Sequence, residues 1–228
     1  MPAPRPEHCR AAAFELMAAQ LPQLETPRAL VHGAVAISRH ALEDADPLRC
    51  DLALQALADR VHARVRSGTP EALLAHAHQV LFDEDGFAGD DHDYYDPDHS
   101  YLPVVLRRHR GIPITLCLVY KAVLERLGLA VQGVNSPGHF LVRVAARGGE
   151  LFIDPFHAGK AMSRNEALLF LAHRTGRSID PQTALLPASN RQWLHRMLQN
   201  LLAVFQQLAI RRHVAAMQEL EQLLMGPR

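Results

Sequence analysis

The chain has 228 residues, 48% of them hydrophobic, and its 24 basic and 24 acidic side chains cancel to a formal net charge of zero. A chain of this length and composition can bury a sizeable core, which excludes a disordered protein. The lack of a basic field argues against nucleic acid or an anionic membrane as a main partner. We therefore expect catalysis or contact with a protein or peptide.

The three cysteines, Cys9, Cys50 and Cys117, are widely separated along the chain. Their odd number and spacing fit neither a disulfide framework nor a zinc ribbon. Residues 1–6 lack the apolar run of a signal peptide, and no segment reaches the length of a membrane span. We expect a cytoplasmic protein that holds no cofactor and no metal, and the sequence leaves its oligomeric state open.

Apolar residues recur at helical spacing over residues 7–80. Pro27, Pro47 and the run 67–70 mark breaks in this pattern. Thr69 is a suitable N-cap for the last segment, because Pro70 follows it at the first helical position. The pattern predicts four helices, the last ending near Leu81.

An acidic, turn-rich segment follows at 83–99. Counted from Asp83, the sixth position is Ala88 where a calcium-binding loop needs glycine, and the twelfth is Tyr94 where a bidentate glutamate belongs. We expect a solvated loop that packs through Phe87, Tyr94 and Tyr95. Binding of calcium or zinc by this loop is the alternative.

Ser100 and Tyr101 open a short apolar helix that ends in the basic run 107–110. Basic side chains suit a helix C-terminus, so this cluster needs no nucleic-acid partner to explain it. Pro113 suits the first turn of the next helix. That helix is apolar on nearly every side as far as Leu127, so we expect it to be buried.

The last part of the chain alternates between strand and helix patterns. Strands are predicted at 129–134, 139–145 and 151–153, with a hairpin turn at 147–149. Ser163 caps a further helix through Leu171, and 191–207 and 210–224 form an antiparallel helix pair. The sequence thus predicts an α+β protein with an N-terminal helical region (1–82), a core (83–188) and a C-terminal helical hairpin (189–228) packed on that core as one globular unit.

Three residues supply the parts of a thiol, histidine and carboxylate site: Cys117 on the buried helix, His139 at the start of a strand and Asp154 at the end of a later one. A two-residue turn at 148–149 would place His139 opposite position 158, on the same face as Asp154 but about 13 Å from it along the strand. A longer or bulged connection would bring the pair together on that face.

Residues 81–155 resemble the bacterial SirB-type proteins of the transglutaminase-like superfamily, with weaker similarity over most of the chain. The resemblance rests on several motifs, among them Tyr94-Tyr95-Asp96-Pro97, Ser100-Tyr101-Leu102, Arg110-Gly111-Ile112-Pro113-Ile114-Thr115, Pro137-Gly138-His139-Phe140-Leu141-Val142-Arg143 and Ile153-Asp154-Pro155-Phe156. It implies a papain-like core, in which a buried helix carrying a nucleophilic cysteine packs on a small antiparallel sheet. His139 and Asp154 match the histidine and aspartate of the superfamily.

The cysteine does not match in the same way. In active relatives it lies about fifteen residues before the glycine that ends its helix, and here that position is Pro113. If Pro113 is the first helical residue, Cys117 lies about 6 Å deeper along the helix axis. If Thr115 is instead the N-cap, Cys117 sits in the first turn, where its pKa would be depressed. The earlier start is favoured by the proline and by the lack of a capping box at the later one.

Two functions follow from these alternatives. The first is a non-catalytic interaction or regulatory module that keeps a pocket built from His139 and Asp154. The motif residues that would line this pocket are Tyr95, Ser100, Tyr101, Pro113, Thr115 and Gly138. The second is a cysteine-dependent acyltransferase or peptidase with Cys117 as nucleophile, His139 as base and Asp154 as the group that orients it.

Overall fold

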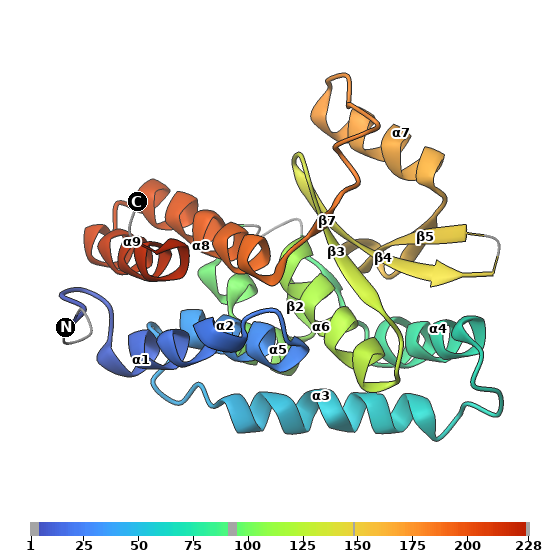
Figure 1. The fold of residues 1–228 in the computed structure, drawn as a ribbon, viewed down its shortest axis with the longest axis horizontal. Helices are drawn as coiled ribbons and strands as arrows, with labels where there is room; N and C mark the ends of the chain where they lie inside the picture. The colour runs from blue at the N-terminus through green and yellow to red at the C-terminus, as the bar shows by residue number, and fades with distance from the viewer. Residues whose placement is uncertain (1–4, 91–94, 148, 227–228) are drawn as a thin grey trace.

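The computed structural model of the chain describes residues 5–90, 95–147 and 149–226. In these ranges the chain forms helices around one small antiparallel sheet, which confirms the α+β class (Figure 1). The N-terminal helices lie together along one side of the molecule, and the sheet lies on the other side of helix α6 (Figure 1). The residues predicted for the site lie where the sheet and its connecting turns meet.

The N-terminal region contains the four predicted helices: α1 (Ala11–Gln20), α2 (Pro27–Arg39), α3 (Pro47–His62) and α4 (Pro70–His78). Three of them begin at the prolines that interrupt the sequence pattern, because the fixed φ of proline suits the first helical turn. Thr26, Asp46 and Thr69 cap these helices through their side-chain oxygens. Local sequence therefore decides where these helices start.

The predicted acidic loop begins later than its sequence suggested. Helix α4 continues as a turn of π-helix, Gln79–Glu84. Asp85, which follows, receives two hydrogen bonds from Arg60 of α3, at 2.7 and 2.8 Å. Glu84 and Asp85 are therefore paired with arginines, whereas Asp83 is exposed on the π-helical turn.

The aromatic residues of the segment behave differently from one another. Phe87 is buried as expected, whereas Tyr95 is 57% exposed, so the packing expected of Tyr95 was wrong. Tyr94 lies outside the described residues. Strand β1 (Ala88–Gly89) pairs in parallel with β2 (Arg110–Gly111). This pairing was not predicted, because strands of two residues are too short to be recognised from sequence.

Helix α6 (Pro113–Arg126) follows the short helix α5 (Leu102–Arg108) and is the central element of the fold. Nearly every residue from Pro113 to Leu124 is buried, as the apolar pattern predicts. The helix packs on α3 and α5 on one side and on the sheet on the other (Figure 1). It therefore joins the helical region to the strands.

The sheet has the strand order β6-β5-β4-β3-β7 and is antiparallel throughout the described residues. Its strands are β3 (Val131–Ser136), β4 (His139–Ala146), β5 (Gly149–Asp154), β6 (Lys160–Met162) and β7 (Pro187–Ala188). The three predicted strands are present, with β3 displaced by two residues from its predicted range. The edge strands were missed because two or three residues are too few to show alternation.

The two faces of the sheet pack against different helices. Phe140, Val142 and Ile153 belong to the main core, which includes most of α6. Leu141 and Phe152 point the other way, into a second cluster that contains residues of helix α7 (Arg164–Thr175). Strand alternation therefore assigns each side chain of β4 to one of two separate apolar environments.

The C-terminal helices α8 (Asn190–Gln207) and α9 (Arg211–Met225) lie antiparallel beside the N-terminal helices and the edge of the sheet (Figure 1). The fully buried Trp193 of α8 packs on Phe140, with ring centroids 4.5 Å apart. A side chain at Gly133 of β3 would collide with Trp193, so glycine is what permits this close approach. Among the described helices, none is long and apolar enough to cross a membrane.

A pair of histidines, the buried His40 and the half-buried His213, links α9 to the end of α2. His40 and His213 share a hydrogen bond of 2.8 Å between ring nitrogens, and His40 is only 3% exposed. Burial, aided by the charges of His213, Arg10 and Arg212 against that of Glu219, lowers the pKa of His40 to about 4. The folded protein therefore keeps His40 neutral at pH values where the unfolded chain protonates it.

We predict that the protein loses stability on acidification between pH 6.5 and pH 4. Over this interval the unfolded state binds a proton that folded His40 does not, so the free energy of unfolding falls, by up to about 3 kcal/mol. Urea titrations at several pH values measure the loss. His40→Leu removes one titrating group and should make this part of the profile shallower, while a slope remains because burial also lowers the pKa of His78 and of His213. Equal slopes in the two proteins would contradict the assignment.

Candidate functional site

His139 and Asp154 meet through their side chains although the strand register does not set them opposite one another. Strands β4 and β5 pair Val142 with Ile153 and close at Ala146 and Gly149. The connection is therefore one residue earlier than predicted, at 147–148, where Gly148 lies outside the described residues. This register leaves Asp154 displaced by two residues from the position opposite His139.

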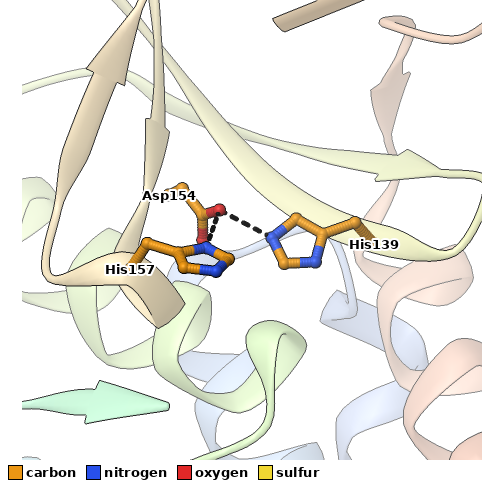
Figure 2. A group of neighbouring side chains, drawn as sticks. All are labelled: His139, Asp154 and His157. Atoms are coloured by element: carbon orange, nitrogen blue, oxygen red, sulfur yellow. Dashed lines mark hydrogen bonds and ion pairs between the residues drawn. The ribbon is translucent and has the colours of Figure 1, made fainter. Parts of the chain in front are cut away.

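The two side chains nevertheless share one face of the sheet and lie on a diagonal, a distance that long side chains can span. Nε2 of His139 lies 2.8 Å from Oδ2 of Asp154 (Figure 2). Both side chains are fully buried. Because a carboxylate can only accept, His139 carries its proton on Nε2 and donates it to Asp154.

Asp154 also begins a tight turn. It is the N-cap of the 3₁₀ turn Pro155–His157, and its Oδ1 accepts a hydrogen bond from the backbone N–H of Phe156 at 3.1 Å. Burial by itself would raise the pKa of the Asp154 carboxyl. The hydrogen bonds and charges of His139 and His157 outweigh burial and lower that pKa to about 2.

The structure adds His157, which the sequence reasoning missed. Its Nδ1 lies 2.7 Å from Oδ2 of Asp154, so two imidazoles converge on one carboxylate oxygen (Figure 2). Its side chain is 38% exposed, in contrast to the buried His139. The available signal was the Asp-Pro start of a turn, which brings the residue three positions after Asp154 back over its carboxylate.

The ring of His139 is enclosed by aromatic side chains. Phe170 of α7 approaches edge-on, with ring centroids 5.2 Å apart, and Phe156 does so at 6.1 Å. Its second nitrogen, Nδ1, has no hydrogen-bond partner among the described residues. With the proton on Nε2, this buried nitrogen presents a lone pair that can accept a proton or a hydrogen bond.

Cys117 is directed elsewhere. Helix α6 begins at Pro113 with Ile112 as N-cap, so the earlier of the two predicted starts is correct. The thiol of Cys117 is fully buried and donates to the carbonyl oxygen of Phe140 at 3.4 Å. Burial, and then the nearby charge of Asp154, raise the pKa of the Cys117 thiol well above its ordinary value.

Strand alternation points the side chains of His139 and Phe140 to opposite faces of β4, although His139 also contacts Phe156 of the main core. Cys117 is part of the main core, together with Phe140 and Val142 of β4. His139 alternates with Phe140, shares its face with Leu141 and contacts Phe170 of α7. No hydrogen bond among the described residues joins Cys117 to His139.

The remaining residues predicted for the pocket lie at varied depths. Ser100, Tyr101, Pro113 and Thr115 are buried, whereas Tyr95 and Gly138 are exposed. The hydroxyl of Thr115, in the first turn of α6, has no partner among the described residues. Gly138 has φ +69° and precedes His139 at the turn into β4. That these six residues line one pocket stays a prediction.

Comparison with known proteins identifies relatives for most of the chain. A family model described as the transglutaminase-like superfamily matches residues 49–199, a range that contains Cys117 and the three clustered side chains. A UPF0162 protein of Xylella fastidiosa is 33% identical over 181 residues, covering 77% of this chain and 64% of the relative. A UPF0162 protein of Pseudomonas aeruginosa is 29% identical over 178 residues, covering 78% and 65%.

A segment of human F-box only protein 21 is also similar, with 34% identity over 134 residues, which is 55% of this chain and 20% of that protein. The chain thus spans less than two thirds of the length of these curated relatives. No solved structure matches it significantly.

We predict that all three cysteines of the native protein react slowly with dithionitrobenzoate. Each is buried, and burial raises the pKa of Cys9 and of Cys50 to about 12. Since the thiolate is the reactive species, little is available at neutral pH. Absorbance of the released thionitrobenzoate should show slow modification in buffer and three rapid equivalents in denaturant. One rapid equivalent in buffer that Cys117→Ser abolishes would contradict the burial of that thiol.

Proposed function

This chain belongs to the transglutaminase-like superfamily, and from that premise we propose that it is a non-catalytic interaction module of the SirB type. In this proposal the site around His139 and Asp154 receives a protein or peptide partner and performs no thiol chemistry. The proposal places the module in the cytoplasm.

The hydrogen bond from Cys117 to the carbonyl of Phe140 is the observation that carries this proposal. Catalysis by a cysteine needs a thiolate and a histidine within hydrogen-bond reach of it. Here burial opposes ionisation of the thiol, and its hydrogen bond goes to a backbone oxygen. Nothing in this arrangement prepares Cys117 to attack a substrate.

The start of α6 supports the same conclusion. The family resemblance puts the nucleophile of active relatives at Pro113, the first residue of this helix, and proline offers no nucleophilic group. Cys117 lies four residues further, about 6 Å along the axis. The field of the helix N-terminus falls off within its first turn, so it favours a thiolate at Cys117 less than it would at Pro113.

The part of the site that remains suits recognition. His157 is half-exposed beside the buried pair, and its ring lies 5.7 Å from that of the half-buried Phe170 of α7. An imidazole next to an apolar side chain can contact both the backbone and an apolar residue of a peptide. The similar segment in F-box only protein 21 makes up 20% of that protein, which shows the unit within a longer chain, as expected of a module.

The alternative is a cysteine acyltransferase or peptidase in which Cys117 attacks, His139 acts as base and Asp154 orients the base. The buried hydrogen bond between His139 and Asp154 favours it, since the same pair would serve a working enzyme. Catalysis would require the thiol to leave the Phe140 carbonyl and reach Nδ1 of His139. The two functions therefore make opposite predictions for Cys117.

We predict no thiol-dependent turnover on a panel of peptide, ester and glutamine-amide substrates. Release of product or of ammonia measures hydrolysis and acyl transfer, and the wild type and Cys117→Ala should give the same background. Cys117→Ala loses only a buried thiol, so circular dichroism and thermal melting can show that it stays folded. A rate that disappears in Cys117→Ala and in His139→Ala would contradict the non-catalytic module and support the cysteine enzyme.

We also predict that a partner contacts the surface beside the site. A photo-crosslinking amino acid placed in bacterial cells at the exposed Lys160, whose ammonium lies over the Phe170 ring, should give one discrete crosslinked species on a denaturing gel. Leu208 is 50% exposed beyond the C-terminal end of α8 and serves as a matched control position. Crosslinks that are absent at position 160, or equal at both positions, would count against a partner at this face.

A further inference from the structure

We propose that His139, Asp154 and His157 form a binding site for a divalent transition metal of the zinc class. The inference goes beyond the proposed function and does not depend on it, because it follows from the donors alone. Among the described residues, this is the one group in which three such side chains converge, with one ligand atom of each lying within 4.8 Å of the others (Figure 2).

The chemistry of the donors selects the metal. Two imidazole nitrogens and one carboxylate oxygen are ligands that Zn²⁺, Co²⁺, Ni²⁺ and Fe²⁺ accept. Calcium and magnesium prefer sites made of oxygen atoms alone, so two imidazoles disfavour them. The site therefore fits a borderline transition metal better than a hard cation.

The spacing of the donors is close to what such a metal needs. Oδ2 of Asp154 lies 2.8 Å from Nε2 of His139 and 2.7 Å from Nδ1 of His157. With metal–ligand distances near 2.0 Å, donors at tetrahedral angles lie about 3.3 Å apart. Each contact must open by about 0.5 Å. The exposed side of His157 leaves that ring room to move.

The surroundings hold two of the ligands in place. Oδ1 of Asp154 accepts the N–H of Phe156, which leaves Oδ2 for the metal. The ring of His139 is fixed between Phe156 and Phe170. Groups of this kind, which orient the ligands, are a regular part of metal sites.

One feature lowers the expected affinity. When Nε2 of His139 binds a metal, its proton moves to Nδ1, which has no acceptor among the described residues. Loss of such a hydrogen bond typically costs about 10- to 100-fold in affinity. We therefore expect micromolar binding, with the half-exposed His157 providing the route of entry and an open coordination position for water.

Isothermal titration with zinc chloride tests the site, using the full chain without a polyhistidine tag and after dialysis against a chelator. The chain has 14 histidines, so a matched control is needed. His173 is an exposed histidine of α7 that takes no part in the cluster. We expect one zinc per chain in the wild type and in His173→Ala, and affinity at least 10-fold weaker in His157→Ala.

Cobalt gives a second readout, because bound Co²⁺ in a tetrahedral site absorbs strongly in the visible range. The wild type should show this absorption, and His157→Ala and Asp154→Asn should lose it, with circular dichroism showing that each variant is folded. No saturable zinc binding by the wild type, or equal binding by wild type and His157→Ala, would overturn the proposal. Neither result bears on Cys117 or on crosslinking at Lys160, so the two proposals can be refuted independently.

Discussion

The buried charge of Asp154 is the constraint on which the site depends. A carboxylate removed from water is costly unless hydrogen bonds and opposite charges compensate it. Here the N–H of Phe156 and the imidazoles of His139 and His157 do so. Through these hydrogen bonds, the start of β4 and the turn that follows β5 both contact the carboxylate of Asp154 at the end of β5. Loss of either imidazole leaves a buried anion less compensated.

Helix α6 imposes a second constraint, on the thiol. Pro113 sets the first turn through its fixed φ, and every later residue of the helix takes its depth from that start. Cys117 consequently falls in the middle of a helix that is buried on all sides, where a small apolar side chain packs well. The same helix that would activate a cysteine at its N-terminus keeps this one protonated in the core.

The candidate site could be predicted from sequence only in part. Side chains alternate along a strand, so every register that shifts the pairing by an even number of residues keeps His139 and Asp154 on the same face. The structure contains the hydrogen bond between them. The distance between them depends on the hairpin turn, which lies one residue earlier than its glycines suggested. His157 was missed because its role comes from the turn that returns it to Asp154, and the Asp-Pro start of that turn is the only local signal of it.

The sequence by itself determined the local features: the helix starts at Pro27, Pro47, Pro70 and Pro113, the burial of α6 and the common face of the histidine and aspartate. Each follows from a residue's own φ preference or from periodicity over neighbouring residues. Only the tertiary structure decided the strand register, the convergence of His157 on Asp154 and the bond from Cys117 to Phe140. These contacts join separate elements, and their geometry depends on how the elements pack, which no local pattern specifies.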